Sequence, residues 1–75
     1  MQNRLKTFQE RLTDAIKESK LSHPQICERS EGKITFQHLW IWQNGKTYPR
    51  IPSLCLLADI LGKSIDYLLG RKNEK

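Results

Sequence analysis

The chain has 75 residues, which is enough for one small domain but leaves no room for a second hydrophobic core. Apolar residues make up 37% and charged residues 28%, a balance typical of a globular domain and not of a disordered chain. Thirteen Lys and Arg against eight Asp and Glu give a net charge of +5, which points to an acidic partner: nucleic acid first, an anionic membrane surface second. We expect no membrane span and no signal peptide, because the apolar runs are too short and the signal-peptide pattern is missing.

The first predicted element is an amphipathic helix over about residues 3–20. Its apolar residues recur at spacings of three and four along one stripe: Leu5, Phe8, Leu12, Ala15 and Ile16. A second, short helix is predicted over about residues 23–30. Ser22 and Gln25 have the spacing of a capping box, and Pro24 falls in the first turn, where its missing N–H matters least. Ile26 and Cys27 are the inward candidates of this helix.

Gly32 is expected to break the second helix in a left-handed conformation, and a third helix is predicted over residues 36–43. Thr35 is its expected N-cap and Asn44-Gly45 its expected end. Leu39 and Trp42 are three residues apart and are predicted to face the core. Residues 46–50 form an extended, basic connection.

A fourth helix is predicted to open at Pro52 and to close at Gly62. Its apolar stripe consists of Leu54, Leu57, Ala58 and Leu61. Ser64 is expected to cap a last short helix that stops at Gly70. The inward candidates of that helix are Ile65, Leu68 and Leu69. The sequence therefore predicts an all-α domain of five helices over residues 1–70, followed by a polar tail over residues 71–75.

The acidic residues are unevenly distributed. No acid occurs between Gly32 and Ala58, and this stretch holds the third helix and three cations, Lys33, Lys46 and Arg50. A surface that approaches phosphates should exclude carboxylates, which repel the nucleic-acid backbone. The alternative is chance clustering of the acids on a solvated face.

The order and spacing of three segments resemble the XRE-type helix-turn-helix proteins, which include the DNA-binding domains of lambdoid phage CI repressors and the Cro proteins. The resemblance covers about residues 8–70, nearly the whole chain. The segments that carry it are Leu21-Ser22-x-x-Gln25-Ile26-Cys27, Gln43-Asn44-Gly45-Lys46 and Leu57-Ala58-x-x-Leu61-Gly62-x-Ser64-Ile65-Asp66-Tyr67-Leu68-Leu69-Gly70.

The resemblance implies a five-helix, lambda repressor-like fold whose third helix enters the major groove of DNA. The implied groove-entering residues are Phe36, Gln37 and His38, with Trp40 and Ile41 on the outward face one turn later. The implied contacts to the DNA backbone are His23, Lys33, Thr35, Asn44, Lys46, Thr47 and Arg50. No cofactor and no metal are implied.

This sequence departs from the family pattern in four places. The turn over residues 27–34 is longer by two residues, which leaves the angle between the second and third helices open. The recognition face is unusually apolar, and Tyr48-Pro49 stiffens the following loop. Ile16 and Gln43 occupy the positions of an Arg–Glu pair that is common in the family, so both charged partners are absent together.

Each candidate contact also has a structural interpretation. Gln37 could bond adenine through N6 and N7 or be a solvated surface residue. His38 could donate to guanine or to a phosphate, and His23 could contact a phosphate, but both could equally be surface residues. Trp40 has three interpretations: contact with thymine methyl groups, a protein–protein patch, or a cover over the longer turn.

The cysteines are expected to be free, buried thiols in a reducing compartment, since two are too few for a disulfide scaffold. His23 and Cys27 have a spacing that could chelate a metal on one helix face. However, no Cys-x-x-Cys or His-x-x-x-His pair supports such a site, and structural thiols are favoured.

We therefore expect a sequence-specific, double-stranded DNA-binding transcriptional regulator, a Cro- or CI-like repressor of phage, prophage or bacterial origin. It is expected to be cytoplasmic and to form a homodimer on its operator. The alternative is a protein-interaction module on the same fold, such as an antitoxin, anti-repressor or repressor partner, with Phe36, Trp40 and Ile41 as its hydrophobic contact. An enzyme is not expected, because the sequence contains no catalytic triad, carboxylate pair or Gly-rich phosphate loop.

Overall fold

The computed structural model describes residues 4–71, which form five helices and, within that range, no strand. The helices are α1 (Arg4–Ser19), α2 (His23–Arg29), α3 (Phe36–Gln43), α4 (Ile51–Leu61) and α5 (Ile65–Leu68). This confirms the predicted all-α class and the number of helices. Residue 3 of the first predicted helix and residues 72–75 of the predicted tail lie outside the described residues.

Side-chain caps set where three of the helices begin. Ser22 Oγ accepts from Gln25 N at 3.3 Å, and Gln25 Oε1 accepts from Ser22 N at 2.8 Å, so the predicted capping box is confirmed. Ser64 Oγ accepts from Tyr67 N at 3.0 Å at the start of α5. Three expected boundaries differ by a residue. Helix α1 ends at Ser19 and α2 at Arg29, each one residue early. Helix α4 begins at Ile51, because Pro52 also fits the second helical position, where its N–H is not needed.

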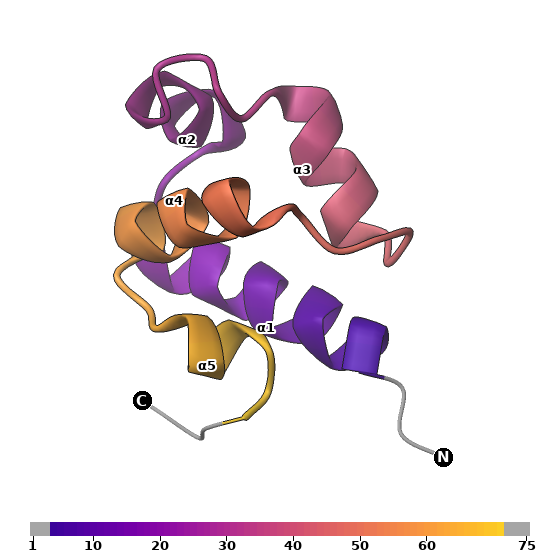
Figure 1. Ribbon diagram of the computed structural model, residues 1–75. Coiled ribbons are helices and arrows are strands. Elements are labelled where there is room, and N and C mark those ends of the chain that lie inside the picture. The colour runs from indigo at the N-terminus through magenta and orange to yellow at the C-terminus, as the bar shows by residue number, and fades with distance from the viewer. Residues whose placement is uncertain (1–3, 72–75) are drawn as a thin grey trace.

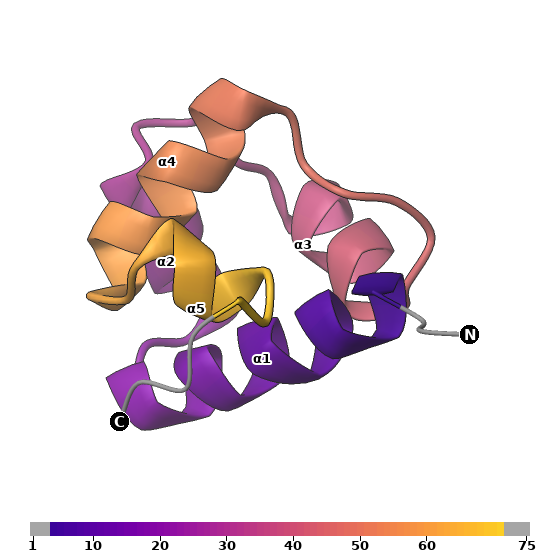
Figure 2. The same ribbon diagram turned by 60° about the horizontal axis from the view of Figure 1, so that its bottom comes forward.

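Helix α1 is the base of the molecule. It packs against α3, α4 and α5, while α2 packs against α3 and α4 against α5 (Figures 1 and 2). The shared core is apolar and contains these residues: Phe8, Leu12, Ala15, Ile16, Ile26, Ile34, Leu39, Trp42, Leu54, Leu57, Ala58, Leu61, Tyr67 and Leu68. Four residues of the predicted stripes lie at its edge and are only partly buried: Leu5, Cys27, Ile65 and Leu69.

The expectation of buried thiols is wrong for Cys55 and only half right for Cys27. Cys55 is exposed and Cys27 is half-buried, and both are free. Cys55 belongs to the apolar run of α4, but it follows the buried Leu54 by one residue, about 100° around the helix. This rotation around the helix axis places Cys55 on the outer side of α4, away from the core.

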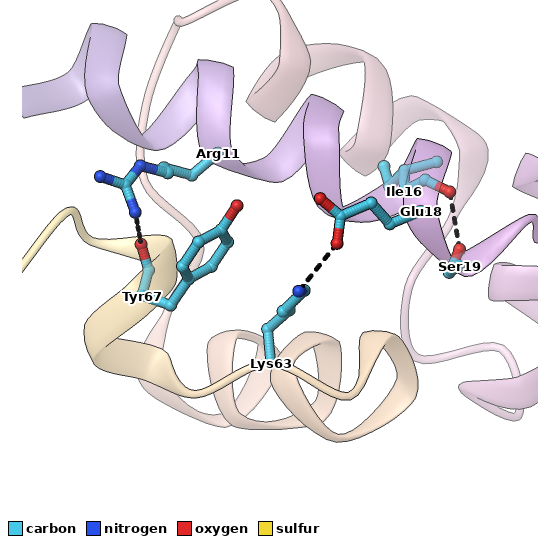
Figure 3. A network of polar contacts seen from close by, with 6 residues as sticks. All are labelled: Arg11, Ile16, Glu18, Ser19, Lys63 and Tyr67. Atoms are coloured by element: carbon cyan, nitrogen blue, oxygen red, sulfur yellow. Dashed lines mark hydrogen bonds and ion pairs between the residues drawn. The ribbon is translucent and has the colours of Figure 1, made fainter. Parts of the chain in front are cut away.

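A polar network joins α5 to α1 (Figure 3). The Arg11 guanidinium carbon lies 4.8 Å and the Lys63 ammonium nitrogen 5.0 Å from the centroid of the Tyr67 ring. Lys63 also forms an ion pair with Glu18 at 2.8 Å. Tyr67 is buried, so the two cations lie over its ring in a site partly shielded from water, where cation–π contacts are strongest.

A helix that crosses a bilayer needs about 20 predominantly apolar residues. Among residues 4–71, no helix meets this requirement of length and hydropathy.

Candidate nucleic-acid interface

The turn between α2 and α3 determines how α3 is presented. Ser30 is 2% exposed, and its hydroxyl donates to Cys27 O at 2.7 Å and accepts from Ile34 N at 2.9 Å. Ile34 is fully buried. The expected left-handed conformation of Gly32 is confirmed by its φ of +83°, and Glu31 before it is also left-handed, with a φ of +58°. The α2–α3 turn is thus closed by its own hydrogen bonds and by a core contact.

Helix α3 has one buried and one exposed face. Leu39 is fully buried and Trp42 is 5% exposed, whereas Phe36 is 60% and Trp40 55% exposed. These values confirm that Trp42 faces inward and Trp40 outward. Gln37 is exposed, and Ile41 is half-buried against the core.

Two of the predicted DNA contacts form the cap of α3. Thr35 Oγ1 accepts from His38 N, and His38 Nδ1 accepts from Thr35 N, both at 3.2 Å. The His38 ring also stacks on Trp42, with the ring centroids 5.4 Å apart and the planes at 11°. His38 therefore lies on the Trp42 side of α3, not beside Gln37, and Nε2 is its ring nitrogen outside the capping box.

His23, another predicted backbone contact, supports the start of α3. Its ring centroid is 5.3 Å from that of Phe36. The contact joins the first residue of α2 to the first residue of α3. Phe36 is consequently exposed but braced on one side.

The C-terminal end of α3 is held by a side chain and by a close approach to α1. Asn44 Nδ2 donates to Trp40 O at 2.7 Å. Lys46 N donates to Ile41 O and Gly45 N to Trp42 O, which is the Schellman pattern. Gly45 has a φ of +70°, and a Cβ there would lie 2.7 Å from Gln9 Oε1.

The connection to α4 is anchored by the burial of Pro49 and by a ring contact of Tyr48. Pro49 is buried, and the Tyr48 ring lies 5.4 Å from that of Phe8 on α1. Lys46, Thr47 and Arg50, all predicted backbone contacts, are exposed. The expected stiffening by Tyr48-Pro49 thus has a physical cause, since both residues hold the loop against the core.

Exposed cations lie in the loops at both ends of α3. Lys33 belongs to the turn before α3, while Lys46 and Arg50 belong to the connection after it (Figure 1). Among residues 4–71, no group of three His, Cys, Asp or Glu side chains could hold a metal ion.

The structure brings together Phe36, Gln37 and Trp40 as an exposed strip, which we call the α3 strip. One exposed apolar residue outside the strip was not expected from the sequence: Ile51 on α4, which is 74% exposed. Its spacing from Leu54 places it on the buried stripe of α4, but as the first residue of that helix it extends past the core.

The chain was compared with protein-family models, curated proteins and solved structures. No family model, no curated protein and no solved structure matches it.

Proposed function

We propose that this chain is a helix-turn-helix protein that binds double-stranded DNA sequence-specifically and regulates transcription. In this proposal α3 is the recognition helix and lies in the major groove. The observation that carries it is the α3 strip, an exposed helix face in a stretch of 27 residues, from Gly32 to Ala58, that contains no acid. Exposed cations in the loops on either side supply the charge that phosphates attract.

In this proposal, the residues of α3 and of its flanking loops have different tasks. Lys33, Lys46 and Arg50 would bind phosphates and set the position of the protein on the duplex, which carries no sequence information by itself. Gln37 and Trp40 would contact base edges, where the sequence is read. Thr35 and Asn44 would act through the backbone of α3, since their side chains cap its two ends.

We further propose that two copies occupy one operator. A symmetric pair of recognition helices reads two half-sites about one helical turn apart, near 34–36 Å. Sedimentation of the complex with a selected duplex tests this: two chains per duplex are expected, and one chain per duplex contradicts it.

The alternative, a protein-interaction module on the same fold, is favoured by a different feature. Phe36 and Trp40, two of its three expected contact residues, are more than half exposed, as is Ile51 on α4, and exposed apolar side chains are typical of protein contacts. Ile51 lies on α4 and is not needed for base contact, but it could contribute to a protein contact. Substitution of Ile51 therefore distinguishes the two functions.

Selection of bound duplexes from a random pool tests the proposal, followed by affinity measurements on the enriched sequence. We expect one sequence family to be enriched, and Trp40→Ala to lower its affinity while Ile51→Ala, the matched control, leaves it unchanged. No enrichment and no binding at low salt would contradict DNA binding and favour the protein-interaction module.

A further inference from the structure

The α3 strip has an unusual chemical composition for a base-reading surface. Helix α3 (Phe36–Gln43) contains no Arg and no Lys. The commonest specific contact to a guanine is a bidentate bond from Arg or Lys to O6 and N7. The strip therefore lacks the side chains that most often select G·C pairs.

His38 is the α3 residue that the sequence suggested as a donor to guanine, and its contacts place it elsewhere. Its Nδ1 accepts from Thr35 N, and its ring is stacked on Trp42. A turn of 100° per residue places His38 about 160° from Trp40 around the helix. A base edge in contact with Trp40 is thus on the other side of α3 from His38.

The residues that are present fit an A·T pair. In the major groove, adenine offers N7 and N6–H₂, which match the amide of Gln37, and thymine offers its C5-methyl group, which matches an apolar side chain. Phe36 and Trp40 are one turn apart, about 40° around the helix, and Gln37 is about 60° from Trp40. The amide and the aromatic rings therefore lie on one face.

The Phe36 ring and the backbone that carries Trp40 are also held in place before binding. The His23 ring braces Phe36 at 5.3 Å, and Asn44 fixes the backbone carbonyl of Trp40. A contact surface that is ordered in the free protein loses less conformational entropy on binding. The exposed cations Lys33, Lys46 and Arg50 and the absence of acids between Gly32 and Ala58 match the charge of duplex DNA.

We propose that the α3 strip selects A·T base pairs, with Gln37 bonding adenine and with Phe36 and Trp40 packed on thymine methyl groups. This inference rests on the proposed function and adds the class of base pair that the site recognises. Thymine methyl groups, not guanine edges, then supply the discrimination.

The test replaces single atoms of the DNA in a duplex obtained by selection. Exchanging thymine for deoxyuridine removes only the methyl group, and exchanging adenine for 7-deazaadenine removes only the N7 acceptor. The same exchanges in the flanking DNA outside the footprint are the matched control. Affinities are measured for the wild type, Trp40→Ala and Gln37→Ala.

We expect each contacted thymine methyl to contribute about threefold to fivefold in affinity, the size of one CH₂ group removed from water. The 7-deazaadenine exchange should weaken binding by about tenfold, as expected for half of a bidentate contact. Trp40→Ala should be insensitive to loss of the methyl group that Trp40 contacts, and Gln37→Ala to loss of N7. Since Trp40 and Gln37 are exposed, both variants should fold, which circular dichroism checks.

Two failures can be told apart. Specific binding that ignores the thymine methyl groups, or a selected site made of G·C pairs, overturns this inference and leaves the proposed function standing. Absence of specific binding to any duplex overturns the proposed function and this inference with it.

Discussion

The Ser30 hydroxyl bonds two backbone groups of the α2–α3 turn, Cys27 O and Ile34 N, inside the protein. We expect Ser30→Ala to lower the free energy of unfolding by about 1–3 kcal/mol, because the buried Ile34 N–H loses its partner. Urea unfolding measures the change. Ser53→Ala, at a half-buried serine in the first turn of α4, is the control and should change stability little. Equal stability of the two variants would show that the turn does not depend on the Ser30 hydroxyl.

Gly70 and Gly32 have nearly the same left-handed backbone, with φ of +78° and +83°, but different surroundings. A Cβ at Gly70 would lie 2.5 Å from Thr7 Cγ2, whereas a Cβ at Gly32 would meet open space. We expect Gly32→Ala to lower the free energy of unfolding by about 1 kcal/mol from backbone strain alone. Gly70→Ala should cost about 1 kcal/mol more, because the β-branched Thr7 cannot easily move away.

A double-mutant cycle checks the origin of that difference. Thr7→Ser removes Cγ2 and keeps the hydroxyl, so it should recover most of the additional loss in the Gly70→Ala background. No recovery in thermal unfolding would mean that the close approach of Gly70 to α1 is not the cause.

Within helix α3, replacing the buried Trp42 and replacing the exposed Trp40 should affect stability differently. Trp42→Ala should lower the free energy of unfolding by about 3–5 kcal/mol, because it empties a core site. Trp40→Ala should change it by less than about 1 kcal/mol, because that side chain is more than half exposed. Chemical denaturation measures both, with Trp42→Phe as a milder variant should Trp42→Ala not fold. A large loss of stability in Trp40→Ala would mean that Trp40 supports the fold and is not held ready for a partner.

Local signals predicted α3 best. Thr35 before it and Asn44-Gly45 after it gave both ends correctly, because caps act within a few residues. Predictions failed where burial depends on distant elements. Tyr67 is buried under two cations from α1 and the α4–α5 loop, and nothing near it in the chain signals this. Cys55 was expected in the core because its neighbours are apolar, but its direction on α4 places it outside.

The sequence predicted where the residues of the candidate site lie better than it predicted what each residue does. Phe36, Gln37 and Trp40 are exposed on one face of α3, as expected from helical spacing. The capping role of His38 could not be read in the same way. The Thr35–His38 capping box uses a His where Glu or Gln is usual, so the usual pattern does not signal it.

Over the whole molecule, the proposed function requires the face around α3 to bind the DNA backbone and to read its bases. Such binding depends on charge, since each phosphate contact adds about 0.9 to the slope of log affinity against log salt concentration. Lys33, Lys46 and Arg50 are the exposed cations of the stretch that contains no acid. Lys17 on α1 is an exposed cation outside that stretch and serves as the matched control.

Fluorescence anisotropy of a labelled duplex across a salt series, with a pool of genomic fragments competing, tests this claim most directly. We predict a log–log slope of several units for the wild type, a slope smaller by about 0.9 for each of Lys33→Ala, Lys46→Ala and Arg50→Ala, and no change for Lys17→Ala. One fragment should also be retained far above the rest. Absence of binding at low salt, or a slope that the three substitutions leave unchanged, would contradict DNA binding through α3.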